Sequence, residues 1–270
     1  MISRICMVRI RRNQESKLSK EVRSVSATGG EKGVKVQAYD RISAIGLTEL
    51  AKLYGVGAGK YADHNFRRGY EWSKSYASLQ RHANLFWSGE DIDQEMNIVH
   101  MSPVAWHAIA LTEFLFVHPD FDDRPIRTAL RWEGTKEQIG EIPVSRFEGD
   151  ELRHEDYYVR RGTNSPEPRF DLIPLRPLAL LASFYGEGHA EEPLKTTGHL
   201  WSNEYARIQE YANRFWWGEN VNPQTGHLNT THVLHHALTL IELWSRHKKC
   251  DDRLIDGAAP IGYDSVPVAK

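Results

Sequence analysis

The sequence is poor in cysteine and contains no long apolar run. Only Cys6 and Cys250 occur, so a disulfide framework or a cysteine-rich metal site is excluded, and this low content suits a reducing compartment. No apolar stretch approaches the roughly 18 residues that span a membrane, and no signal-peptide pattern is present. We therefore expect a cytoplasmic protein with no membrane partner.

Excess charge and the commonest catalytic motifs are also missing. The net charge is −2, which gives no strong signal for nucleic-acid binding. The chain has no P-loop, no G-x-G-x-x-G and no G-x-S-x-G sequence, which excludes several large classes of nucleotide-binding protein and hydrolase. The hydrophobic fraction of 40% is typical of a folded globular protein.

What the sequence does contain is one segment twice. Residues 72–124 align without a gap to residues 201–253, and 20 of 53 positions are identical. Upstream, Tyr54-Gly55 corresponds to Tyr185-Gly186 at an offset of 131 instead of 129, so an insertion or deletion lies between the two matches. We interpret the chain as an internal duplication.

Hydrophobic periodicity predicts three helices in each copy. We expect them at 47–61, 74–88 and 102–117, and again at 175–190, 203–217 and 230–247. Ser73 is a candidate N-cap and Gly89 a candidate C-cap of the second helix. The predicted fold is all-α, with two tandem copies of one helical unit packed as a pseudo-dimer and a short irregular or β insert between them.

Composition divides the chain further. The expected segments are a flexible basic arm (1–33), a first helical repeat (34–124), a linker or insert (125–168), a second repeat (169–253) and a tail (254–270).

Several short motifs of the first copy follow one another in a recognisable order. They are Lys60-Tyr61-Ala62-Asp63-His64-Asn65-Phe66, Trp72-Ser73, Arg81-His82, Gly89-Glu90-Asp91-Ile92-Asp93, His100 and Trp106. This order resembles the phage dATP/dGTP diphosphohydrolase-type family, a relative of the MazG-like all-α nucleoside triphosphate pyrophosphohydrolases. The resemblance covers about 85 residues in each copy and implies metal-dependent cleavage of purine deoxynucleoside triphosphates between the α- and β-phosphates.

The sequence departs from the family pattern in two ways. The MazG signature pairs E-x-x-E with E-x-x-D, and only Glu90-x-x-Asp93 is present here. In the second copy, Asp91, Asp93 and Glu95 are replaced by Asn220, Asn222 and Gln224. The second copy is therefore predicted to be degenerate, which leaves one working site in each chain.

Four carboxylates within six residues form the predicted metal site. Glu90, Asp91, Asp93 and Glu95 offer the hard oxygen ligands that Mg²⁺ or Mn²⁺ prefers. A solvated acidic loop is the alternative. We assign catalysis to Glu90, Asp93 and His82, and substrate binding to Lys60, Tyr61, Asn65, Arg67, Trp72, Arg81 and His100. Surface ion pairing is the alternative for the cations.

Other repeated residues admit structural explanations. Trp72 recurs as Trp201, so a role at the start of a helix competes with base stacking. Asp122-Asp123-Arg124 recurs too, and is expected to brace the end of the third helix or to hold the neighbouring copy. The i, i+3, i+4 run of His232, His235 and His236 has a spacing that can bind a transition metal.

The sequence therefore predicts a nucleotide pyrophosphohydrolase that requires Mg²⁺ or Mn²⁺. A catalytically inactive protein that sequesters a signalling nucleotide is the alternative, and a purely structural phage protein is a third reading. Whether the pseudo-dimer assembles into a larger homo-oligomer is left open.

Overall fold

The computed structural model describes residues 23–125, 167–189 and 199–255. The chain divides into two compact units, residues 1–35 and 36–270. In the first unit, strands β1 (Arg23–Val25) and β2 (Glu31–Gly33) form an antiparallel hairpin. The arm expected at 1–33 thus contains a hairpin in its described part. Most of the predicted insert and tail lies outside the described residues.

The first half of the second unit (residues 36–125) contains three α-helices joined by short turns and one small β-hairpin. The helices are α1 (Ala44–Lys60), α2 (Trp72–Trp87) and α3 (Met101–Val117). Strands β3 (Ile92–Asp93) and β4 (Ile98–Val99) lie between α2 and α3. Short 3₁₀ turns at Tyr39–Arg41 and Pro119–Phe121 precede and follow the set.

The second half (residues 167–255) repeats this order of elements. Its helices are α5 (Leu175–Gly186), α6 (Trp201–Trp216) and α7 (Asn229–Arg246), flanked by 3₁₀ turns at Phe170–Leu172 and Lys248–Cys250. A single bridge between Val221 and Leu228 stands where β3 and β4 pair Ile92 with Val99. The all-α fold predicted from periodicity is confirmed, and its mostly helical character is consistent with a MazG-like fold.

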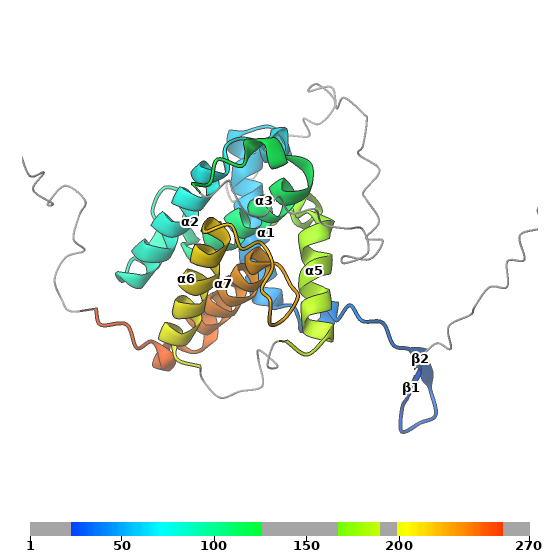
Figure 1. The fold of residues 1–270 in the computed structure, drawn as a ribbon. Helices are drawn as coiled ribbons and strands as arrows, with labels where there is room; N and C mark the ends of the chain where they lie inside the picture. The colour runs from blue at the N-terminus through cyan, green and yellow to red at the C-terminus, as the bar shows by residue number, and fades with distance from the viewer. Residues whose placement is uncertain (1–22, 126–166, 190–198, 256–270) are drawn as a thin grey trace, which may run out of the picture. The chain divides into compact units, whose positions relative to one another are not determined.

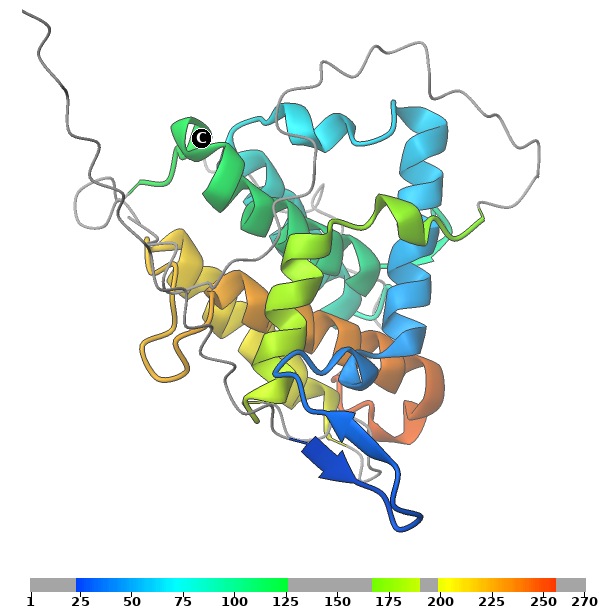
Figure 2. The ribbon, with the colours of Figure 1, turned by 90° about the vertical axis from the view of Figure 1, so that its right-hand side faces the viewer.

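The helices pack around a central pair, α3 and α7, which contact each other (Figures 1 and 2). Helix α2 packs on α3, α6 packs on α7, and α2 and α6 also contact each other. α1 lies against α7 as well as α3, and α5 lies against α3 as well as α7. The first helix of each half therefore covers the last helix of the other half. One continuous hydrophobic core runs through both halves.

Two arginines hold the halves together by equivalent contacts. Arg124 donates to the carbonyl oxygen of Phe215 at 2.6 Å, and Arg253 donates to that of Phe86 at 2.5 Å. Each guanidinium also lies 4.6 Å from the centre of the same phenylalanine ring. The predicted role of the Asp-Asp-Arg sequence in holding the neighbouring copy is thus correct.

The start of α2 differs from the prediction. Ser73 lies inside the helix, because α2 begins at Trp72 with Glu71 as its N-cap residue. The backbone N–H of Ser73 donates to the Asp123 carboxylate at 2.9 Å, so a side chain distant in sequence satisfies the helix end. Asp123 therefore caps the second helix instead of bracing the third. Gly89 follows the end of α2 with a φ of 104°, a conformation that favours glycine.

Candidate functional site

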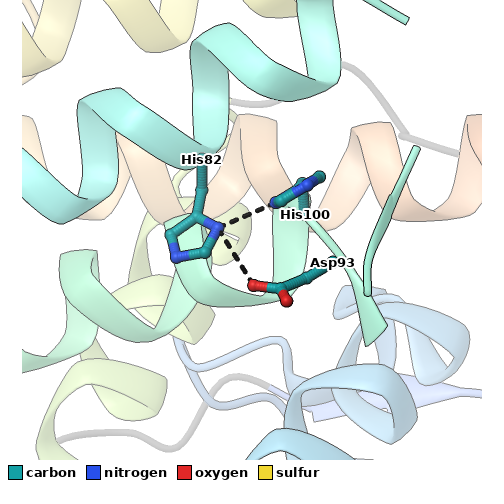
Figure 3. Close-up of side chains that lie close together, drawn as sticks. All are labelled: His82, Asp93 and His100. Atoms are coloured by element: carbon teal, nitrogen blue, oxygen red, sulfur yellow. Dashed lines mark hydrogen bonds and ion pairs between the residues drawn. The ribbon is translucent and has the colours of Figure 1, made fainter. Parts of the chain in front are cut away.

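Three buried side chains from consecutive elements of the first half meet beside the β3–β4 hairpin. His82 lies near the end of α2, Asp93 ends β3, and His100 immediately precedes α3 (Figure 3). Their metal-ligating atoms all lie within 4.8 Å of one another. We call this group the first-half cluster.

The hairpin itself positions Asp93. One carboxylate oxygen accepts hydrogen bonds from the backbone N–H groups of Glu95 (2.9 Å) and Met96 (3.2 Å), which fixes the turn. The other oxygen faces His82, 3.7 Å from its Nδ1 atom. Because the turn occupies only one oxygen, the second remains directed at the histidines.

A line of side chains connects the cluster to solvent. Arg81 donates to Nε2 of His82 at 3.1 Å, since a guanidinium can only donate. The N–H of that ring is then at Nδ1, which lies 2.8 Å from Nδ1 of His100. This arrangement leaves the His100 proton on Nε2, which faces Glu90 at 3.4 Å and has no hydrogen-bond partner. Glu90 thus lies beside the cluster.

Burial favours the neutral form of His82 and of its neighbour His107. It lowers the pKa of His82 to about 4, and the positive charge of Arg81 and the proximity of His100 act in the same direction. Burial likewise lowers the pKa of His107 to about 3. The His107 ring stacks on His82 with centroids 6.4 Å apart and contacts Ser75 through Nδ1 at 3.2 Å. Near pH 7 the His82 and His107 rings are therefore uncharged and do not repel a cation.

The chemistry of the donors identifies a suitable class of cation. Two imidazoles and a carboxylate, with Glu90 adjacent, match a first-row transition ion such as Mn²⁺ better than Mg²⁺, which prefers an all-oxygen shell.

Other predicted ligands lie elsewhere. Asp91 bonds to residues of the second half: Arg253 at 2.8 Å, Trp244 at 2.9 Å and Lys248 at 3.4 Å. These contacts give Asp91 a role in joining the halves. Glu95 is exposed and pairs with Lys60 at 2.5 Å, and this hydrogen bond raises the pKa of Lys60.

The predicted substrate-binding residues are also divided. Trp72 is buried and stacks on Phe215 of the second half with centroids 5.8 Å apart, so it is not placed to contact a base. Its recurrence in both copies has this structural cause. Tyr61 and Asn65 are exposed near the end of α1, and the carbonyl oxygen of Arg67 accepts a hydrogen bond from His118. Within the described residues, none of these four belongs to the first-half cluster.

The second half has none of the three ligands. Tyr211, Asn222 and Asn229 occupy the positions of His82, Asp93 and His100. Asn222 nevertheless keeps the turn, because its side-chain oxygen accepts from the N–H groups of Gln224 (2.8 Å) and Thr225 (3.3 Å). The turn thus requires only an Asp or Asn, whereas the negative charge is particular to the first half.

Two further histidine-carboxylate groups occur among the described residues, both in the second half. Glu204, His235 and His236 form a mostly buried group, and Glu187, His189 and His227 form a more exposed one. The histidine run on α7 was visible in the sequence, but Glu204 was missed. Its signal was the change from Ser75 in the first copy to Glu204 in the second.

Comparison with known proteins finds a similarity for the first half. The family model described as dATP/dGTP diphosphohydrolase, N-terminal, matches residues 26–124. No match was found among curated proteins or solved structures. Among the described helices, none combines the length and apolar character that crossing a bilayer requires. The matched segment includes the whole first-half cluster, and over residues 26–124 the chain is similar to the dATP/dGTP diphosphohydrolase N-terminal family.

Proposed function

We propose that the chain is a metal-dependent diphosphohydrolase that converts purine deoxynucleoside triphosphates to the monophosphate and pyrophosphate. The observation that carries this proposal is the family match, which covers every residue of the first-half cluster. The preference for purine deoxynucleotides rests on the family name alone.

In this proposal His82, Asp93 and His100 hold a divalent cation, with Mn²⁺ favoured over Mg²⁺ by the two imidazoles. The bound cation would supply electrostatic stabilisation of the charge that develops on the phosphates. Arg81 is exposed beside the cluster and would bind a phosphate oxygen through its guanidinium. Lys60, released from Glu95, would add a second positive charge.

Hydrolysis requires water to attack the α-phosphorus while the bond to the oxygen bridging the α- and β-phosphates breaks, so that pyrophosphate leaves. Glu90 is the nearest carboxylate that the turn does not occupy, and it would accept the proton of that water. His100, between Glu90 and His82, would keep the carboxylate in position.

We further infer that the second half is a copy of the same unit that lost its site while keeping its structural role. The loss of the three ligands, with the turn intact at Asn222, supports this reading. The second half would then supply the partner surface that α2 and α3 need, with one active site in each chain.

One observation favours a second candidate, a protein that binds a nucleotide without cleaving it. Helix α2 carries no carboxylate, and the one on α3, Glu113, pairs with Arg176 at 3.6 Å. The E-x-x-E half of the MazG signature is therefore missing from the helices that flank the cluster. A site that only binds a nucleotide would need fewer metal-ligating carboxylates than a site that hydrolyses it.

The test is release of pyrophosphate and monophosphate from a panel of dNTPs and NTPs with Mn²⁺ or Mg²⁺. Asp93→Asn should lower turnover at least about 100-fold while preserving the fold, because Asn222 makes the same turn hydrogen bonds. Asp120→Asn, an exposed carboxylate on the Pro119–Phe121 turn, is the matched control and should leave turnover unchanged.

Asp91→Asn tests whether Asp91 joins the two halves, as its contacts indicate, or binds the metal, as the sequence predicts. It should retain turnover, because Asp91 bonds to the second half, whereas a metal ligand would lose it. If no nucleotide is cleaved but one of them raises the melting temperature, the binding protein replaces the hydrolase. If there is neither cleavage nor binding, both proposals fail.

A further inference from the structure

We propose that Glu204, His235 and His236 form a second transition-metal site, separate from the first-half cluster and specific to the second half. Glu204 comes from α6, and the two histidines are adjacent on α7. Their ligand atoms all lie within 4.8 Å of one another. None of the three residues comes from a turn or a loop. Two packed helices hold all three.

At two of these three positions, the second half has a metal-ligating residue where the first half has none. Ser75 and Trp106 of the first half correspond to Glu204 and His235, whereas His107 corresponds to His236 and is retained. Both changes introduce a metal-ligating side chain, and they occur on neighbouring helices. In the first half, the hydroxyl of Ser75 is hydrogen-bonded with His107 at 3.2 Å and with Tyr70 at 2.9 Å, and no carboxylate stands there.

The surroundings of Glu204 suit a cation. The side chain is 7% exposed, and its hydrogen bonds and ion pairs within the described residues are all to histidines: His236 at 2.7 Å and His199 at 3.1 Å. A buried carboxylate normally requires a compensating positive charge. A cation bound between Glu204 and the two histidines of α7 would supply that charge.

A buried hydroxyl orients one of the histidines. The Tyr185 hydroxyl lies 2.8 Å from Nδ1 of His235, which leaves Nε2 of that ring available for a metal. Metal-ligating histidines usually have such a partner on the second ring nitrogen. At the equivalent position of the first half, Tyr54 faces Trp106 instead, and its hydroxyl has no hydrogen-bond partner.

The ligand atoms indicate the class of metal ion that would bind. Two imidazoles and one carboxylate are a common set for Zn²⁺ and related first-row ions, whose ligand atoms lie about 3.3 Å apart in a tetrahedral site. His199 is 44% exposed and contacts the other oxygen of Glu204, so it marks the side from which an ion can enter.

The experiment measures Zn²⁺ binding by the full chain after chelator treatment, by calorimetry and by metal analysis of the desalted protein. The Asp93→Asn/His100→Asn background removes the first-half cluster by substituting the residues found in the second half. This protein should bind one Zn²⁺, and adding Glu204→Gln should weaken that binding at least about 100-fold. Adding His189→Gln, which alters the exposed group with Glu187 and His227, should leave it unchanged.

Equal Zn²⁺ affinity with and without Glu204→Gln would overturn the proposal, and so would the absence of any ion in the background protein. If circular dichroism shows that Glu204→Gln fails to fold, the position of the ion decides. Anomalous scattering from Zn²⁺-soaked crystals of the background protein should place it between Glu204 and the two histidines. No peak there would mean that Glu204 is neutralised only by protonated histidine. Neither readout depends on nucleotide hydrolysis.

Discussion

The two halves of the molecule share a scaffold but differ in where their polar chemistry lies. In the first half, His82, Asp93 and His100 gather beside the hairpin between α2 and α3. In the second half, Tyr211, Asn222 and Asn229 stand at the equivalent positions, and a different polar group lies between α6 and α7, around Glu204. A helical pair with the same packing can thus accommodate ligating residues at either of two levels.

The difference shows which residues the scaffold requires. The contacts that recur in both halves, such as the arginine bonds to Phe215 and Phe86, join one half to the other. The contacts that occur only once are the candidates for chemistry. This distinction favours a structural role for Trp72 and makes His82 a candidate for the chemistry.

The largest expected effect comes from breaking an arginine contact between the halves. Arg124→Ala removes a 5% exposed guanidinium that bonds to Phe215 and Asn220 and stacks on Trp72. We expect the free energy of unfolding to fall by about 3–5 kcal/mol, measured by urea denaturation, because a buried charged group and its partners are lost together.

Arg253→Ala should have a similar effect, because its contacts to Phe86 mirror those of Arg124 to Phe215. The exposed Arg207→Ala is the control and should change stability by less than about 0.5 kcal/mol. A loss below about 1 kcal/mol for both buried arginines would show that the halves are held by the core alone.

The second effect tests a hydrogen bond at the start of α1 that has no counterpart at the start of α5. Ser43 caps α1 by accepting from the N–H of Gly46, and its hydroxyl donates to Glu242 on α7. The equivalent of Ser43 in the second half is Pro174, which cannot make this bond. Glu242→Gln should therefore lower the free energy of unfolding by about 1–2 kcal/mol.

A double-mutant cycle with Ser43→Ala checks the assignment to this bond. The two substitutions should cost less together than the sum of the single values, because each removes the same hydrogen bond. Fully additive losses would mean that Glu242 acts through another partner, such as Arg246 at 3.6 Å.

The sequence predicted the local features of this molecule better than its long-range contacts. The helices were found because the apolar residues recur at helical spacing, and His82, Asp93 and His100 because they lie in ordered motifs. The role of Asp91 was missed because its partner Arg253 is distant in sequence. Similarly, Asp123 was not recognised as the cap of α2, since only the folded chain brings it to Ser73.

The acidic run also shows why neighbouring residues need not act together. Glu90, Asp91, Asp93 and Glu95 are close in sequence, but the hairpin directs their carboxylates to different partners. Asp93 faces the histidines because its turn bonds fix it there. The backbone conformation that separates these side chains leaves no periodic signal in the sequence.

The third effect concerns a pair of aromatic stacks at the boundary of the halves. Tyr76 stacks on Trp216 with centroids 4.3 Å apart, and Tyr205 stacks on Trp87 at 4.4 Å. We expect double-alanine cycles to give coupling energies of about 0.5–1.5 kcal/mol for each stack. Because the geometries match, the two values should agree; a coupling near zero for one stack would show that the halves differ there as well.

The smallest effect should have the opposite sign. Glu113 occupies the position of Glu242, but one of its carboxylate oxygens is buried without a partner and the other is 3.6 Å from Arg176. Burial raises the pKa of Glu113 from its usual 4.5, partly offset by the charge of Arg176. At pH 7 the ionised form therefore costs stability, and Glu113→Gln should be neutral or stabilising by up to about 1 kcal/mol.

The pH dependence distinguishes this explanation from a packing effect. A carboxyl group with a raised pKa in the folded state contributes stability below pH 4.5, and this contribution is lost as the pH rises through the folded-state pKa. The advantage of Glu113→Gln should thus be largest near pH 7 and disappear near pH 4, as followed by urea unfolding at both values. An advantage that is the same at both would mean that ionisation plays no part. Glu242→Gln, the same change in the other half, should still be destabilising at pH 7, because Glu242 has the Ser43 partner that Glu113 lacks.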